Sequence, residues 1–336
     1  MKKLFLRKVT MIRCAVALML STIVVAAIAD DAVGAAASAS TAKPIPALLI
    51  TNAERAMLLG IARAGDQMVA VGGNGVIVRS PDGKAWRQSK SPVDTAFNAV
   101  AFADARHGWA VGHDSVIVGT SDGGVTWAIQ NFQPDLNAPI FSVLPFSAQK
   151  VLVVGAFGLI KVTEDSGATW NDIDAPAISS DKLHLNSIAM TNNGKFVVAG
   201  ERGLVGFSAD GVQWTRVATQ YEGSFFGVLP WGEKGAITFG MRGNVYTCED
   251  IEAAAWKKIE TATTASFFGG EVQEDGSVLL TGSDSTMLTI QADGSVSAAK
   301  KVSKGGMSDS SLTGSLRIKS SQILIGESGI VSITGN

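Results

Sequence analysis

The sequence predicts an all-β fold, a seven-bladed β-propeller, on three observations. First, a short apolar run ending in glycine recurs seven times at spacings of 40, 43, 45, 40, 42 and 44 residues, the anchoring glycines being Gly72, Gly112, Gly155, Gly200, Gly240, Gly282 and Gly326. Spacings of this size are typical of one four-stranded propeller blade. Second, several copies continue to a Ser/Thr-x-Asp turn with glycine and a tryptophan. Third, no segment after residue 29 shows the 3.6-residue apolar period of an amphipathic helix.

Within the second copy, runs rich in Val, Ile and Phe and bounded by turn residues predict four strands, innermost first, at 97–102, 108–112, 116–120 and 126–129. The turn before the last strand is an Asp box. Its Asp accepts backbone N–H groups, and its Gly adopts a conformation that is costly for a residue with a Cβ. Its Trp is expected to pack between neighbouring sheets. Five of the seven tryptophans occupy this place: Trp86, Trp127, Trp170, Trp214 and Trp256.

The two ends of the repeat region predict how the ring closes. The last copy, residues 312–336, offers candidates for three strands, whereas the apolar run 46–50 precedes the first copy and is unassigned. A strand at 46–50 that pairs as the outer strand of the last blade removes two open sheet edges. We therefore expect residues 43–336 to form a seven-bladed propeller closed by an N-terminal strand in the last blade.

Composition excludes several classes of protein. Charged residues make up 17% of the 336 residues, hydrophobic residues make up 46%, and there are 37 glycines. This balance excludes a disordered charged chain and a coiled coil. Without its first 29 residues, which hold five basic residues and no acid, the chain has 23 basic and 30 acidic residues. A net charge of about −7 argues against nucleic acid as a partner, because that binding relies on clustered Lys and Arg.

The N-terminus is typical of an exported protein. Residues 1–29 combine basic residues through Arg13, a 16-residue apolar stretch, and Ala27-Ile28-Ala29 as a cleavage site. We expect a signal peptide at 1–29, a flexible leader at 30–42, and a periplasmic or otherwise exported location; a retained membrane anchor is the alternative. Cys14 follows Met-Ile-Arg, which does not match a lipobox, so no covalent lipid anchor is expected. Cleavage leaves Cys248 as the one thiol, which precludes an intrachain disulfide.

The glycine turns, the Asp boxes and the N-terminal run together resemble a known family. This is the family of BNR or Asp-box propellers related to the photosystem II stability and assembly factor, and the resemblance covers about residues 43–336. It implies a non-enzymatic assembly factor that binds a membrane-protein intermediate. Many cyanobacterial members are lipoproteins, and this chain differs from them in that respect.

No catalytic, cofactor or metal site is expected from the motifs. His107, His113 and His184 are scattered without metal-ligand spacing. Sialidases are the sharpest enzymatic alternative, because they share this architecture and use a Tyr nucleophile, a carboxylate and three arginines. Tyr221-Glu222 lies in a suitable connection, but the Arg-Ile-Pro-type motif of sialidases is missing. A sialidase-like hydrolase or a glycan-binding lectin is therefore the alternative function.

One face of the ring is expected to carry the chemistry. The turns between the second and third strands and the connections between blades share this face, and loops on a rigid scaffold commonly form binding sites. Arg202 and Arg242 stand at the same repeat position in adjacent blades, so they should be neighbours. Either they bind a carboxylate or anionic peptide, or each pairs with a local acid such as Glu201. The candidate partner-binding residues are Arg202, Arg242, Glu201, His113, Asp114, Phe157 and Tyr221.

The predicted function is a non-catalytic exported propeller. It acts as a protein-binding scaffold, or as an assembly or accessory factor, for an envelope membrane-protein complex. The expected partner is an envelope or membrane protein, such as a transporter or an assembly intermediate. No cofactor is expected.

Overall fold

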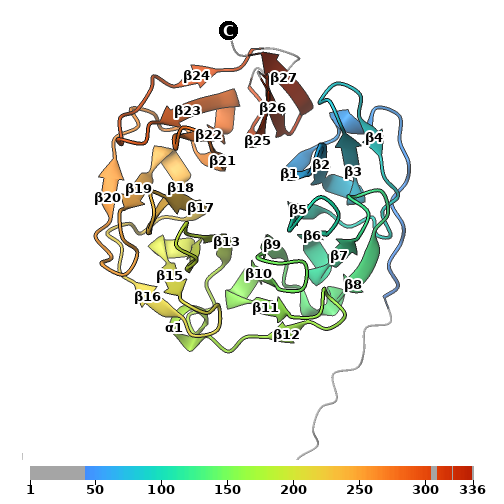
Figure 1. The fold of residues 1–336 in the computed structure, drawn as a ribbon, viewed down its shortest axis with the longest axis horizontal. Coiled ribbons are helices and arrows are strands. Elements are labelled where there is room, and N and C mark those ends of the chain that lie inside the picture. The colour runs from blue at the N-terminus through green and yellow to red at the C-terminus, as the bar shows by residue number, and fades with distance from the viewer. Residues whose placement is uncertain (1–41, 304–308, 320, 335–336) are drawn as a thin grey trace, which may run out of the picture. The chain divides into compact units, whose positions relative to one another are not determined.

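Seven antiparallel β-sheets are arranged in a ring (Figure 1), which confirms the predicted all-β seven-bladed propeller. The computed structural model describes residues 42–303, 309–319 and 321–334. The predicted signal peptide at 1–29 and the leader up to residue 41 lie outside the described residues. In the part of the chain that is described, no helix is both long and apolar enough to cross a bilayer.

Each blade begins with an innermost strand that faces the centre of the ring. These strands are β1 (Leu58–Ala64), β5 (Phe97–Phe102), β9 (Ile140–Pro145), β13 (Leu185–Met190), β17 (Phe225–Trp231), β21 (Phe267–Val272) and β25 (Leu312–Ile318). The second strands, which carry the anchoring glycines at their ends, are β2 (Gln67–Gly72), β6 (Gly108–Gly112), β10 (Val151–Gly155), β14 (Phe196–Gly200), β18 (Gly235–Gly240), β22 (Val278–Gly282) and β26 (Ser321–Gly326).

The third and outer strands complete the blades. The third strands are β3 (Ile77–Ser80), β7 (Ile117–Thr120), β11 (Ile160–Thr163), β15 (Val205–Ser208), β19 (Val245–Cys248), β23 (Thr286–Ile290) and β27 (Gly329–Thr334). The outer strands are β4 (Arg87–Gln88), β8 (Ala128–Asn131), β12 (Asn171–Asp172), β16 (Thr215–Val217), β20 (Lys257–Ile259) and β24 (Lys300–Lys301). Six sheets thus have four strands, and the sheet of the seventh blade has three.

Helical structure in the described residues is confined to short turns. The 3-10 helices are η1 (Ala53–Arg55), η2 (Gly73–Gly75), η3 (His113–Ser115), η4 (Pro134–Leu136), η5 (Ala156–Gly158), η6 (Glu201–Gly203), η7 (Met241–Gly243) and η8 (Ser283–Ser285), and the one α-helix among the described residues is α1 (Pro176–Ser179). Six of these 3-10 helices, η2, η3, η5, η6, η7 and η8, join the second strand of a blade to its third.

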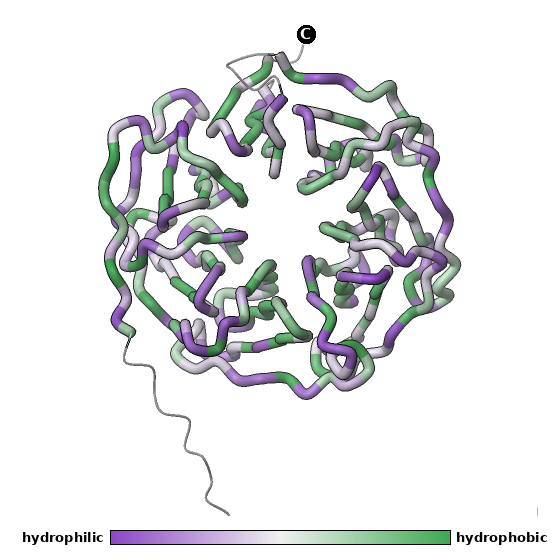
Figure 2. The backbone as a smooth tube through the Cα atoms, turned by 180° about the vertical axis from the view of Figure 1, so that it is seen from behind, coloured by the Kyte–Doolittle hydropathy of each residue, from purple (hydrophilic) through white to green (hydrophobic). Residues whose placement is uncertain are grey.

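The hydrophobic core lies between neighbouring sheets. The second strands are almost completely buried because another blade covers each of their faces; β6, β10 and β14 are buried along their whole length. The largest cluster joins blades three and four, where Leu152 and Ile160 of one sheet pack with Phe196 and Trp214 of the next. Figure 2 shows hydrophobic stretches in every blade around the ring. Packing between blades therefore holds the ring together.

The Asp boxes have the predicted structural role. In the second blade, Asp122 Oδ1 accepts hydrogen bonds from the backbone N–H groups of Val125 (3.0 Å) and Thr126 (2.9 Å), and Oδ2 accepts one from the Thr126 hydroxyl (2.6 Å). Trp127 is buried, and its indole N–H donates to the Gly124 carbonyl (3.1 Å). The box is thus a self-contained turn that places its tryptophan against the preceding blade.

The structure corrects the predicted mode of closure. Residues 46–50 form no strand and lie along blade one instead, since the Ala47 N–H donates to the Ser91 carbonyl (3.2 Å) and the Gln88 side chain bonds the backbone of Leu48 and Ile50. Figure 1 shows this segment in blue on the outer rim. The run is apolar but exposed, with Leu48 at 80% exposure. Its apolar side chains are therefore not buried against a sheet.

Blades one and seven are joined without a shared sheet. The Thr313 hydroxyl of β25 donates to the Leu58 carbonyl of β1 (2.7 Å), and Ile325 of blade seven is buried in one cluster with Ala70 and Val78 of blade one. The short helix η1 contacts both β27 and β4. Side-chain packing and η1 therefore close the ring.

Candidate functional site

One face of the ring is built from seven equivalent turns between second and third strands. In every blade the first turn residue donates its backbone N–H to the carbonyl just before the innermost strand; in blades four and five these bonds are Glu201 N–H to His184 O (3.1 Å) and Met241 N–H to Ser224 O (3.2 Å). This bond fixes each turn to the incoming connection. The turns and the connections thus form one face on a rigid frame, as predicted.

The central residue of six of these turns adopts the left-handed backbone conformation. Asn and Asp tolerate this region, and they occupy it in blades one, two and six, at Asn74, Asp114 and Asp284. Blades three, four and five instead place Phe157 (φ 57°), Arg202 (φ 51°) and Arg242 (φ 55°) there. This conformation costs about 1–2 kcal/mol for an ordinary L-residue. Strained residues of this kind cluster at functional sites, so these three adjacent blades define the candidate site.

Arg202 and Arg242 are both exposed and occupy equivalent positions on neighbouring blades. Among the described residues neither guanidinium takes part in an ion pair. The local acid Glu201 bonds His184 instead, through the His184 backbone N–H (2.8 Å) and ring Nδ1 (3.0 Å). The alternative in which Glu201 neutralises an arginine is therefore not what the structure shows.

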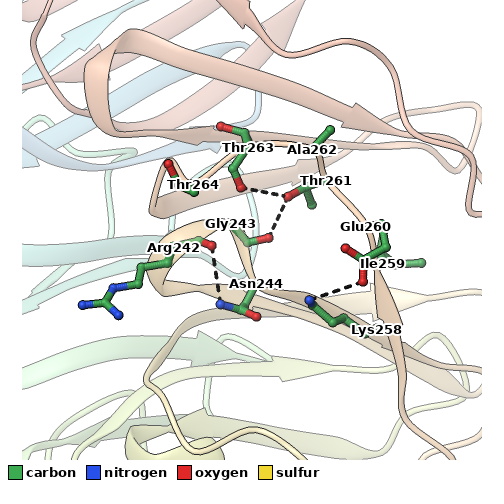
Figure 3. Close-up of a pocket in the computed structure, with 10 residues that line it drawn as sticks. All are labelled: Arg242, Gly243, Asn244, Lys258, Ile259, Glu260, Thr261, Ala262, Thr263 and Thr264. Carbon is green, nitrogen blue, oxygen red and sulfur yellow. Dashed lines mark hydrogen bonds and ion pairs between the residues drawn. The ribbon is translucent and has the colours of Figure 1, made fainter.

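A threonine clamps each arginine turn from the outer side. The Thr219 hydroxyl donates to the Gly203 carbonyl (2.7 Å) in blade four, and the Thr261 hydroxyl donates to the Gly243 carbonyl (2.8 Å) in blade five. Arg242 stands at the edge of a surface hollow of about 550 Å³ (Figure 3). Its guanidinium points away from the other labelled residues of the hollow. The two threonines thus fix the backbone of the turns, and their hydrogen bonds do not involve the arginine side chains.

An aromatic cluster borders the arginines on blade three. Phe157 is 54% exposed, and its ring meets the His184 ring edge-on at 5.0 Å between centroids. Phe141 stacks on the other side of His184 at 5.6 Å. The site thus combines an apolar rim with two cations, a combination suited to a peptide that carries both apolar and acidic side chains.

Tyr221 lies in the same region but is not arranged as a nucleophile. Its ring packs on Phe225 and Tyr246, and its hydroxyl donates to the Met241 carbonyl (3.3 Å). Burial, together with the neighbouring Tyr246, raises the pKa of the Tyr221 phenol above its usual value. A tyrosine nucleophile needs activation by a base or a lowered pKa. The geometry of Tyr221 therefore favours a packing role.

The remaining predicted residues lie on blade two, the blade that precedes the one carrying Phe157. His113 is exposed, and the Asp114 carboxylate accepts a hydrogen bond from the Thr95 hydroxyl (2.8 Å). The structure thus places the predicted residues on four consecutive blades, with Phe157, Glu201, Arg202, Tyr221 and Arg242 on blades three to five. The described residues bring together no group of three His, Cys, Asp or Glu side chains that could hold a metal.

Sequence reasoning missed Phe141 and the ring contacts of His184. Phe141 is the second residue of β9, at a bulge that shifts the register between β9 and β10. The other innermost strands have a bulge at the same position, which is occupied by Asn98, Asn186, Phe226, Phe268, Thr313 and Leu59. These bulge residues are always the second residue of the innermost strand. Aligning the seven repeats would have identified this position in the sequence.

Comparison with known proteins gives one family. The family model described as "Photosynthesis system II assembly factor YCF48" matches residues 78–177 and 146–311. No curated protein matches.

Solved structures of similar fold come from different proteins. "YCF48 bound to D1 peptide" is 18% identical, with a TM-score of 0.67, over 89% of this chain and 99% of that one. YCF48 from Cyanidioschyzon merolae is 15% identical, with a TM-score of 0.66, over 88% and 99%. Virginiamycin B lyase from Staphylococcus aureus is 10% identical, with a TM-score of 0.69, over 86% and 98%. At these identities the likenesses show the fold alone.

Proposed function

This chain belongs to the Photosynthesis system II assembly factor YCF48 family, and we propose that it is a non-catalytic propeller that binds an acidic segment of a membrane protein during assembly. A relative of the same fold binds a D1 peptide. The observation that carries the proposal is the pair Arg202 and Arg242, held in strained turns on adjacent blades with no ion pair among the described residues.

The positive charges of Arg202 and Arg242 favour a partner segment that carries carboxylates. Neither exposed guanidinium has an ion-pair partner among the described residues, and a carboxylate-bearing ligand would supply one through charge-assisted hydrogen bonds. The planar guanidinium group of arginine also forms bidentate hydrogen bonds with carboxylates. The exposed Phe157, at the equivalent turn of blade three, offers a surface for an apolar side chain of the same segment.

The N-terminal sequence supports a proposal for the location of this activity. Residues 1–29 have the composition of a signal peptide, which supports the proposal of an exported protein, and we propose an envelope membrane-protein complex as its partner. A transporter and an assembly intermediate are both suitable partners.

The decisive experiment is the charge reversal Arg202→Glu with Arg242→Glu. We expect the folded double variant to lose copurification with its membrane partner, and wild-type binding to weaken as salt rises. The matched control is Arg87→Glu with Arg106→Glu, which changes the net charge equally at exposed positions away from this face. Undiminished partner recovery by the folded double variant contradicts the proposal. Hydrolysis of a fluorogenic sialoside that is lost in Tyr221→Phe supports the enzymatic alternative instead.

A further inference from the structure

The second residue of the innermost strand links neighbouring blades in only part of the ring. In blades two, four and seven it is polar, and its side chain donates a hydrogen bond to the carbonyl of the first residue of the next innermost strand. These residues are Asn98 (2.9 Å), Asn186 (2.7 Å) and Thr313 (2.7 Å). Blades three, five and six have a phenylalanine at this position: Phe141, Phe226 and Phe268. A phenyl ring donates no such bond, so bonding between blades does not account for these aromatic residues.

Phe226 and Phe268 form an aromatic pair on blades five and six. Their ring centroids are 5.6 Å apart, and the ring planes are inclined by 33°. Phe226 is half-buried and Phe268 is 37% exposed, whereas Phe225 and Phe267, which precede them, are fully buried. Among the described residues, neither ring of the pair contributes to the hydrophobic clusters between blades four and seven. The pair thus presents an aromatic surface to solvent.

The strand that carries Phe268 begins between two glycine turns of opposite charge. Ser266, two residues before Phe268, accepts a hydrogen bond at its Oγ from the backbone N–H of Arg242 in η7 (3.1 Å). The Ser266 carbonyl accepts a hydrogen bond from the N–H of Ser283 in η8 (2.9 Å), and the central residue of η8 is Asp284. The helix η7 also contacts β21 itself. The aromatic pair therefore lies beside the joint between a cationic turn and an anionic turn.

The two charged side chains at this joint are not paired within the described part of the chain. Arg242 and Asp284 are both exposed, and neither takes part in an ion pair there. Asp114, at the equivalent position of blade two, accepts a hydrogen bond from the Thr95 hydroxyl (2.8 Å), whereas the Asp284 carboxylate accepts none from a described residue. Both charges are therefore available to a ligand.

The exposed charges on either side of the joint keep the same order. Arg202 adds a second cation on blade four, and Glu222, in the connection from blade four to blade five, is an exposed acid that the two cations outnumber. On the other side Asp309 adds a second acid, in the connection whose Ser310 carbonyl accepts from the Ser285 N–H of η8 (2.8 Å). A bound segment thus meets positive charge on one side of the aromatic pair and negative charge on the other, which sets its register.

A small hollow lies in the centre of the ring next to Phe268. Its volume is about 170 Å³, and it is lined by the first halves of β21, β25, β1 and β5, which face the centre in Figure 1. Gly269 and Gly270, which follow Phe268 directly, form its wall on blade six. An apolar cavity of about 150 Å³ holds one benzene ring. The hollow therefore has room for one apolar side chain that enters past the aromatic pair.

We propose that Phe226 and Phe268 hold an apolar side chain of the partner segment, at a point where that side chain lies between an acidic residue and a basic residue. The acidic residue binds Arg242, the apolar side chain packs on the two rings, and the basic residue pairs with Asp284. This inference rests on the proposed function, because the same segment is taken to bind the arginines. It adds the order of residue types that the segment must present.

The probe is a fluorescent peptide, Gly-Glu-Gly-Phe-Gly-Lys-Gly, tested on the full chain by anisotropy at low salt. Its acidic, apolar and basic residues alternate with glycine, so that all three point to one face of an extended segment. We expect it to bind, and the peptide with serine in place of phenylalanine to bind at least fivefold more weakly. The peptide with glutamate in place of lysine should also bind at least threefold more weakly.

Two variants with matched controls assign these effects to residues. Phe268→Ser should weaken binding of the phenylalanine peptide at least fivefold. Val272→Ser, at the other end of the same strand and 39% exposed, should not change it. Asp284→Arg should reverse the preference for lysine over glutamate, and arginine already occupies the equivalent turn position in blades four and five. Asp114→Asn, at that position on blade two, should keep the wild-type preference.

A fluorescent hexaglutamate peptide separates this inference from the arginine proposal, because it has no apolar side chain. Its binding should be lost in the double variant Arg202→Glu, Arg242→Glu, and Phe268→Ser should weaken it far less than it weakens the phenylalanine peptide. If hexaglutamate binding survives the charge reversal, the arginine proposal is wrong. Absence of binding by the phenylalanine peptide, or equal binding of the phenylalanine and serine peptides, overturns the aromatic site. An unchanged preference for lysine in a folded Asp284→Arg variant overturns the charge order.

Discussion

The carboxylate of Glu201 engages His184 twice, at 2.8 Å from the backbone N–H and 3.0 Å from ring Nδ1. The pair ties the glycine turn of blade four to the connection that enters the same blade. It also holds the His184 ring between Phe141 and Phe157. Glu201 thus positions the aromatic cluster. Because its carboxylate bonds His184, it forms no ion pair with the adjacent Arg202, and the positive charge of Arg202 is not neutralised by this acid.

Replacing Glu201 with Gln tests that arrangement. The amide oxygen still accepts from His184, so the free energy of unfolding should change by less than about 1 kcal/mol. Removing the negative charge beside the arginines should tighten binding of a fluorescent hexaglutamate peptide several-fold at low salt. The difference should disappear at high salt, because exposed charges are then screened. Equal or weaker peptide affinity of the variant at low salt contradicts the assignment; Glu222→Gln, an exposed acid in the next connection, is the comparison.

Backbone strain at Arg202 predicts an unusual order of stabilities. Its left-handed conformation (φ 51°, ψ 39°) suits glycine, so Arg202→Gly should be more stable than Arg202→Ala by about 1 kcal/mol. For a chain of this size that is roughly 2 °C in Tm. Both variants should lose the same peptide affinity, because both remove the guanidinium.

The matched pair Arg216→Gly and Arg216→Ala should show the reverse order. Arg216 lies in β16, and glycine weakens a strand interior. If glycine is also the more stable choice at position 216, the effect does not come from the left-handed turn.

Acid should weaken the propeller through its Asp boxes. Hydrogen bonds from the Thr169 hydroxyl (2.7 Å) and backbone N–H (2.9 Å), followed by that from the Thr163 hydroxyl, lower the pKa of Asp165 to about 2. The folded-state pKa is lower than the unfolded one, so this stabilisation is complete at neutral pH and is lost as the pH falls from about 4 through about 2. Tm should therefore be steady near neutrality and drop over that window.

Asp165→Asn isolates this contribution. Its Tm should be lower than that of wild type at pH 7 and should fall less between pH 4 and pH 2, since asparagine has no proton to gain. Thermal melts by circular dichroism across that range give the comparison. Curves that stay parallel would mean that other carboxylates, such as Asp104 with its pKa of about 2, account for the acid sensitivity.

The repeat could be predicted from sequence because geometry enforces it. A Cβ on Gly112 would collide with the Ala96 carbonyl, and one on Gly240 would collide with the Ser224 carbonyl. Close approach of the turn to the connection thus demands glycine in each blade, which makes the period visible. The equivalence of Arg202 and Arg242 follows from the same register.

Features that depend on side-chain reach could not be predicted in this way. The bond between Glu201 and His184 spans 17 positions and depends on the shape of the turn. Residues 46–50 are bonded to blade one by the Gln88 amide, at Leu48 and Ile50, and by the bond from Ala47 to Ser91. Hydrophobicity suggested an outer strand of the last blade there, but the run is exposed, and no sequence pattern indicates that a glutamine side chain of blade one bonds it.

Truncation from the N-terminus distinguishes the observed closure from the predicted one. Removing residues 1–41, the expected signal peptide and leader, should leave Tm unchanged. Removing residues up to 50 deletes the bonds of Ala47, Leu48 and Ile50 to blade one, which are exposed, so the cost should not exceed about 3 kcal/mol. Gln88→Ala should reproduce most of that loss.

Removing residues up to 56 also deletes η1, whose Ala53 is buried and which contacts both β27 and β4. The melting temperature should then fall much further, because the joint between the first and last blades is opened. Calorimetry of the three truncated proteins measures the steps. A collapse of stability that is already complete on removal of residues 43–50, with Gln88→Ala melting like wild type, would restore residues 46–50 as the closing element of blade seven.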